Sequence, residues 1–179
     1  MENILKRYNT KNMNRDQIDD VSFYEALLAC APKFSANYKE IDKQVNRIAM
    51  SKYERKNDTP YRYDIDTKKQ FDTVIGLTDI KIELLKIDEL YQKWFRALDD
   101  KRKQFVETYF IKKNADVLRK MSKDGHYYTK HIIPVIASFR CYFKLMSDLS
   151  ELDLISNPII YETYVKTYDK NIRRNKEKK

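Results

Sequence analysis

Apolar residues between positions 77 and 98 recur at alternating intervals of three and four, the spacing of one face of an α-helix. The positions are Leu77, Ile80, Leu84, Ile87, Tyr91, Trp94 and Leu98. We therefore predict a long helix over residues 67–98. This heptad seam fits either a coiled-coil homodimer through the 77–98 face or a bundle helix that packs within one chain. Ile82, Leu85 and Phe95 widen the apolar face, which favours the bundle.

Two shorter helices are predicted before the seam. Residues 16–31 form the first, with an apolar face of Ile18, Val21, Leu27 and Leu28. Pro32 ends that helix, because the residue before a proline avoids the α region. Ser35 is then the expected N-cap of a second helix with apolar residues at helical spacing. Those residues are Tyr38, Ile41, Val45, Ile48 and Ala49. Residues 56–66 contain an Asn-Asp-Thr-Pro sequence and are predicted to be a loop.

After the seam, Asp99 and Asp100 offer an N-cap and a favourable negative charge for a new helix. Its inner face is Phe105, Val106, Tyr109 and Phe110. A short helix follows at residues 115–121, capped by Asn114. Residues 122–125 form a turn, in which Gly125 can adopt the left-handed conformation that ends a helix.

A longer helix is predicted over residues 126–149, with Tyr128 and Ile132 facing the core. Pro134 lies inside this helix. Its ring removes one backbone hydrogen bond and clashes with the carbonyl of Lys130, so we expect a kink there. All the regular secondary structure predicted for residues 16–149 is helical, so the predicted fold class is all-α.

The short helix and the helix after it form a helix-turn-helix unit within residues 99–150. In that geometry, side chains at the start of the second helix meet base edges in the major groove. We expect these to be His126, Tyr127, Thr129, Lys130 and Ile133. Basic residues nearby are expected to contact phosphates: Lys101, Arg102, Lys103, Lys112, Lys113, Arg119, Lys120 and Lys123. The alternative interpretation is a small helical bundle with a charged face.

Composition narrows the function classes. Among 179 residues only two are glycine, so the glycine-rich phosphate loops of nucleotide-binding enzymes cannot be built. The soft metal ligands Cys30, His126, His131 and Cys141 lack metal-site spacing, and helix caps and loops explain the acidic pairs. We therefore expect no enzymatic activity, cofactor or metal. No apolar run approaches the length of a membrane span, and two distant cysteines indicate a reducing cytoplasm.

The charge balance points to an anionic partner. Lysine and arginine number 36 against 27 acidic residues, a formal net charge of +9, which favours nucleic acid over a membrane surface. The Lys-, Asn-, Ile- and Tyr-rich bias of AT-rich genomes is the competing explanation. Residues 151–179 are predicted to hold a short helix at 159–168 and a basic tail. That tail is either a nucleic-acid arm or a solvated terminus.

Residues 103–140 resemble the C-terminal part of phage late-transcription activators of the ArpU, RinA and LtrC class. The resemblance rests on the aromatic and basic run at 105–113, on Val117 in the short helix, and on Thr129-x-His131-x-Ile133 entering the next helix. Members of that class look like the promoter-reading fourth region of a sigma-70 factor, and a variable helical half precedes the module. Here that half is residues 1–98.

The resemblance implies a DNA-binding transcriptional regulator that activates late genes of a phage or mobile element in the cytoplasm of a bacterial host. Its implied partners are double-stranded DNA, host RNA polymerase and a protein anti-activator. The alternative function is that of a helical interaction protein, which binds a transcription regulator or polymerase without binding DNA.

Overall fold

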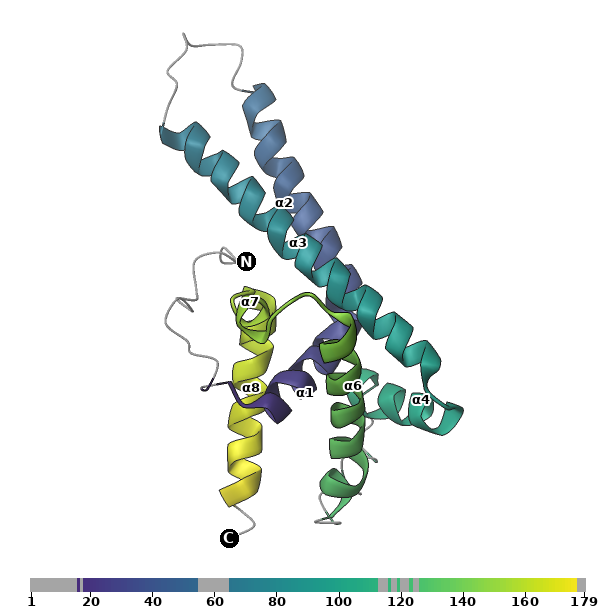
Figure 1. The fold of residues 1–179 in the computed structure, drawn as a ribbon. Helices are drawn as coiled ribbons and strands as arrows, with labels where there is room; N and C mark the ends of the chain where they lie inside the picture. Colours follow the sequence, from purple (N-terminus) through teal and green to yellow (C-terminus); the bar gives the residue numbers. More distant parts are fainter. Residues whose placement is uncertain are drawn as a thin grey trace.

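The computed structural model describes residues 16, 18–54, 65–112, 116, 119, 123 and 126–176. Within these residues the ordered elements are α-helices with short 3-10 and π-helical turns, and none is a β-strand. The all-α prediction is therefore confirmed (Figure 1). None of the helices in this part of the chain is both long and apolar enough to cross a membrane.

Helix α1 (Asp20–Cys30) lies at the centre of the core. Nearly all of its side chains are buried, and it packs against α6 and α8 (Figure 1). Asp19 caps it by accepting a 2.8 Å hydrogen bond from the backbone N–H of Ser22. A 3-10 turn (Ala31–Lys33) follows, so Pro32 does end the α-helix as predicted. The N-cap prediction for Ser35 is wrong, because the turn leads directly into α2, which begins at Phe34.

Helices α2 (Phe34–Glu54) and α3 (Ile65–Ala97) pack side by side and extend beyond the other helices as an arm (Figure 1). All the seam residues from Leu77 to Leu98 are 9% exposed or less. Part of the seam packs on α2, where the Tyr38 hydroxyl donates a 2.9 Å hydrogen bond to the carbonyl of Leu84. This packing within one chain is the arrangement that the bundle interpretation expects.

The apolar face of α3 is narrower than predicted. Ile82 and Leu85 are 48% and 44% exposed, whereas Phe95 is packed against the core. The expectation that all three widen the buried face is wrong for Ile82 and Leu85. The reason is that α2 and α6 contact α3 on its seam side, and both residues lie on the opposite side of the helix.

Helix α4 (Asp100–Val106) begins as predicted, with Asp99 accepting a 2.9 Å hydrogen bond from the N–H of Arg102. It continues into a π-helical turn, η5 (Glu107–Ile111). The predicted short helix and turn at 115–125 lie largely outside the described residues. Asp116 and Arg119 are helical, and so is Lys123, which the sequence had suggested for the turn.

The longer helix consists of a π-helical turn, η6 (Tyr128–Ile132), and α6 (Ile133–Met146), so it ends before residue 149. Pro134 lies in the first turn of α6. The N–H of Ile133 bonds to the carbonyl of Tyr128, five residues back. The expected disturbance at Pro134 therefore takes the form of a widened turn immediately before it, a common way for a helix to absorb a missing bond.

Helices α7 (Glu151–Ile155) and α8 (Pro158–Lys176) complete the fold. The prediction of a short helix followed by a tail is wrong, because α8 runs through most of the basic segment. It is held along α1, where the N–H of Asp19 donates to the Tyr164 hydroxyl at 3.1 Å. At its start, the side-chain amide of Asn157 donates to Glu83 on α3 at 2.9 Å.

Candidate nucleic-acid interface

A pocket of about 330 Å³ lies where the end of α3, the start of α4 and the start of α6 meet. Its lining combines an apolar base with a basic rim: Trp94, Leu98, Lys101, Arg102, Phe105, Lys130, His131, Pro134, Val135 and Ser138. The Trp94 indole N–H donates to Ser138 Oγ at 3.3 Å, which ties α3 to α6 beneath the pocket. Among the described lining residues the charged side chains are all basic, and none is a carboxylate.

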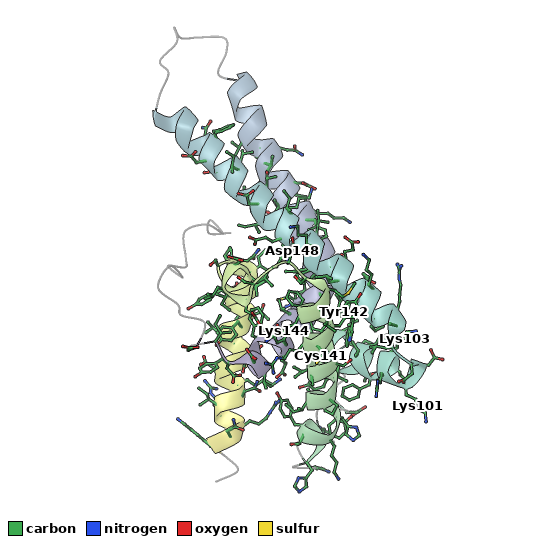
Figure 2. All side chains as sticks on the ribbon, in the orientation of Figure 1. Lys101, Lys103, Cys141, Tyr142, Lys144 and Asp148 are labelled. Carbon is green, nitrogen blue, oxygen red and sulfur yellow. The ribbon has the colours of Figure 1, made fainter. Side chains whose placement is uncertain are left out.

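The cations of this pocket come from two elements. Lys101 and Arg102 lie in the first turn of α4, and Lys130 lies in η6; all three are exposed. Figure 2 shows Lys101 at the outer end of α4, away from α1 and α8. Arg102 has an exposed ion pair with Asp99 at 3.4 Å, a type of contact that contributes little. Among the described residues, no carboxylate lies within ion-pair distance of Lys101 or Lys130.

Aromatic rings border the cations. The Phe105 ring lies 6.3 Å from Tyr127 and 6.2 Å from His131, and the rings of Tyr127 and His131 are 4.6 Å apart. On its other side, Phe105 stacks with Tyr109 at 6.0 Å. This cluster joins α4 to the start of the helix that leads into α6. Rings beside cations are a common feature of surfaces that bind nucleic acid.

The predicted base-contacting residues divide into two groups. His126, Thr129 and Lys130 are exposed, whereas Tyr127 and Ile133 are half-buried. Part of the Tyr127 side chain is covered by its ring contacts with Phe105 and His131. The start of the helix that leads into α6 is thus accessible and has basic residues beside it.

The predicted phosphate-contacting residues come from several segments of the chain. Those described are exposed or half-buried: Lys101, Arg102, Lys103, Lys112, Arg119 and Lys123. Lys113 and Lys120 lie outside the described residues. The structure brings Lys101 and Arg102 to the same pocket as Lys130. Lys112 lies beyond the far end of α4 and is paired with Glu107 at 3.4 Å.

Sequence reasoning did not name Phe105 and His131 as members of this site. Phe105 was placed on the inner face of its helix, and His131 was considered only as a metal ligand and as part of the Thr129-x-His131-x-Ile133 motif. A signal was present. Basic and aromatic residues follow one another at 101–105 and again at 127–131, and this mixture differs from the purely apolar seam of α3. Two such segments in one module point to a shared surface, although only the fold shows that they meet.

The inner side of η6 faces a second charged group, which is buried. Glu25, 3% exposed, accepts hydrogen bonds from the hydroxyls of Tyr128 at 2.7 Å and Tyr109 at 3.4 Å. Two residues of α8 reach the same carboxylate, Asn171 at 3.0 Å and Lys170 at 3.5 Å. We call Glu25, Tyr109, Tyr128, Lys170 and Asn171 the Glu25 cluster. It joins α1, η5, η6 and α8.

The Glu25 cluster shifts the titration of its tyrosines. Burial, followed by the nearby Glu25 carboxylate, raises the pKa of Tyr109 to about 12. The same two causes raise the pKa of Tyr128 well above its usual value. The guanidinium of Arg174 lies over the Tyr128 ring, 4.3 Å from its centroid. Two basic residues of the expected tail, Lys170 and Arg174, therefore contact the core of the fold.

Within the described part of the chain, no three His, Cys, Asp or Glu side chains come together as a metal site would require. Cys30 is buried, and this burial raises the pKa of its thiol, whereas Cys141 is exposed. Comparison of the chain with protein-family models, with curated proteins and with solved structures finds no match.

Proposed function

We propose that the chain binds double-stranded DNA through the pocket between α4 and the start of α6. The observation that carries this proposal is the convergence of Lys101, Arg102 and Lys130 on one pocket, whose described lining residues include no carboxylate. Arg102 has an exposed ion pair with Asp99, and Lys101 and Lys130 add positive charge beside it. A phosphate backbone is attracted to such a cluster and releases its own counterions when it binds.

Two kinds of contact follow from the geometry. Lys101 and Arg102 approach the DNA from α4 and bind phosphates, which sets the register of the protein on the duplex. His126, Thr129 and Lys130 lie at the start of the next helix, where a helix-turn-helix protein meets base edges. Thr129 can contact a thymine methyl group, and Lys130 can donate to guanine.

The biological role follows from the resemblance to the ArpU, RinA and LtrC class. We infer that DNA binding serves activation of late genes in a phage or mobile element. Host RNA polymerase is then the second partner, and an anti-activator protein is a third. The chain acts in the cytoplasm of the bacterial host.

A second candidate function is binding to a regulator or to polymerase without DNA. Leu145 and Met146 at the end of α6 favour it, because they are 83% and 58% exposed. Apolar side chains at one exposed helix end suit a protein partner better than a phosphate backbone. Substitution of both residues by Ser separates the two functions, because it affects only the second.

The test is equilibrium binding to labelled duplex DNA over a series of salt concentrations. The logarithm of the binding constant should fall linearly with the logarithm of salt concentration. A variant with Lys101→Ala, Arg102→Ala and Lys130→Ala should lose about 0.9 of slope for each phosphate contact removed. The matched control is Lys39→Ala, Lys43→Ala and Arg47→Ala, which removes the same charge from exposed positions of α2. Equal loss in both variants, or no binding by the unmodified chain, would overturn the proposal.

A further inference from the structure

Helix α3 has a second row of apolar residues, on the side opposite its buried seam. Phe71 is 60% exposed, Ile82 is 48% exposed, and Ile75 and Leu85 are each 44% exposed. With Thr78 between Ile75 and Ile82, the row alternates intervals of four and three, like a coiled-coil seam. The described residues of the chain leave this row in contact with solvent.

The row continues as a groove along the C-terminal half of α3. The groove has a volume of about 580 Å³ and is lined by Ile82, Leu85, Lys86, Asp88, Glu89, Gln92, Lys93 and Arg96. The exposed face of α3 is thus apolar in its first half and more polar in its second. An occupant must match both halves.

Charges beside the row change sign along the helix. On one flank, Asp72 and Asp79 precede Lys86 and Lys93, all at intervals of seven. On the other flank, Lys81 precedes Asp88 by the same interval. A helix that is acidic at one end and basic at the other on a single flank is complementary to a reversed copy of itself.

We propose that two copies of this chain pair through the exposed faces of their α3 helices, in antiparallel orientation. With Ile82 opposite the partner subunit's Leu85, the two-fold axis lies between these residues. Ile82 and Leu85 of the two copies then cover one another near the axis. The rest of the row, from Phe71 to Thr78, packs against the groove along the C-terminal half of the partner's α3. Phe71 lies beside the partner subunit's Arg96, where a cation can rest on the ring.

The same register matches the flanking charges. Asp72 lies opposite the partner's Lys93, and Asp79 lies opposite the partner's Lys86. On the other flank, Lys81 lies opposite the partner's Asp88. A parallel pair would instead bring Lys81 beside the partner's Lys86, which is repulsive. Charge complementarity therefore favours a second copy of the chain as the partner of this face, and an antiparallel orientation of its α3.

Ion pairs within the chain do not oppose this arrangement. Lys81 contacts Asp42 at 2.6 Å, Lys86 contacts Asp148 at 3.6 Å, and Lys93 contacts Glu89 at 2.7 Å. All three are surface pairs with partly or largely exposed members. Such pairs contribute little, so exchanging them for contacts between copies has a small effect on the fold.

Sedimentation equilibrium of the full chain over a concentration series tests the pairing. We expect the unmodified chain to dimerise, and Ile82→Asp with Leu85→Asp to raise the dissociation constant by about 100-fold or more. Its melting temperature should stay near that of the unmodified chain. The matched control is Leu145→Asp with Met146→Asp, which adds two carboxylates to other exposed apolar positions and should leave dimerisation unchanged.

The orientation is tested by two charge-reversal variants. Asp72→Lys with Asp79→Lys makes one flank entirely basic, and Lys86→Asp with Lys93→Asp makes it entirely acidic. Each variant alone should be monomeric, and an equimolar mixture should form a heterodimer. A mixture that stays monomeric would overturn the antiparallel register.

Other results would overturn the pairing itself. The unmodified chain could sediment as a monomer at every concentration, or the dimer could survive the Ile82 and Leu85 substitutions. A monomer that loses thermal stability when Ile82 and Leu85 are replaced would instead show that a segment of the same chain covers the row.

Discussion

The two sides of η6 carry charge in opposite ways. On the inner side, the Glu25 carboxylate is buried and receives donors from Tyr109, Tyr128, Asn171 and Lys170. On the outer side, cations around an open pocket have no carboxylate among the lining residues. The first arrangement is complete within the chain and stabilises the fold. The second leaves Lys101 and Lys130 exposed, where an anion from outside can bind, and this difference is the physical basis for proposing a binding role.

The largest effect should follow from removing the buried carboxylate. Glu25→Ala removes the carboxylate that accepts hydrogen bonds from the hydroxyls of Tyr109 and Tyr128. We expect a loss of about 3 kcal/mol in the free energy of unfolding, measured by urea denaturation. Glu25→Gln keeps an acceptor for Tyr128 and should lose less. Equal losses would show that packing, and not hydrogen bonding, determines the role of this residue.

The Glu25 cluster also predicts a stability loss at alkaline pH. The pKa of Tyr109 rises from about 10 in the unfolded chain to about 12 in the fold. The unfolded chain therefore loses this proton first, and stability that is present below pH 10 disappears progressively as pH rises through 12. The contribution is about 2–3 kcal/mol for this residue. Urea denaturation between pH 8 and 12 measures it, and Tyr109→Phe should flatten the profile. A profile unchanged in Tyr109→Phe would contradict the prediction.

Changes on the outer side of η6 should affect binding and leave stability nearly unchanged. Thr129→Ala and Lys130→Ala replace exposed side chains, so the melting temperature should stay close to that of the unmodified chain. Specific DNA binding should weaken by about 1–3 kcal/mol for each lost base contact, and non-specific binding should weaken less. Lys39→Ala on α2 is the control for loss of one charge. Equal weakening of specific and non-specific binding would remove both residues from base contact.

The smallest effect is expected at Lys112, which the sequence grouped with the phosphate-contacting residues. Lys112 lies after the end of η5 and is not among the described residues that line the pocket. Lys112→Ala should change DNA binding less than Lys101→Ala does, and should change stability by less than about 0.5 kcal/mol. Anisotropy titrations of the two variants at one salt concentration make the comparison. A larger effect at Lys112 would move the DNA contact toward the end of η5.

The sequence predicted the fold well where one periodicity dominates. The seam from Leu77 to Leu98 is buried throughout. Seven apolar residues at regular helical spacing identify a single face of the helix as the buried one. The same reasoning failed for Ile82 and Leu85, since periodicity identifies an apolar face but does not say how much of it a neighbour covers. The length of α8 was also missed, because its basic residues resemble a tail until Lys170 and Arg174 are seen against the core.

The candidate site was predictable only in part. Lys101, Arg102 and Lys130 were named from their position in a helix-turn-helix layout, and they meet at one pocket. Glu25 was not identified, because a single glutamate within an apolar helix looks like a solvent-facing residue. Its partners lie more than 80 positions away in sequence, so no local pattern connects them to it.

The most direct test of the central claim is an amide NMR titration of the chain with duplex DNA. It compares the pocket with α8, which is also basic and has an open surface lined by Lys166, Asp169, Lys170, Arg173 and Arg174. The account predicts the largest shifts at residues 101–105 and 127–134, and smaller ones at 166–174, where Lys170 and Arg174 already have partners. Shifts concentrated at 166–174, with the pocket unchanged, would contradict it.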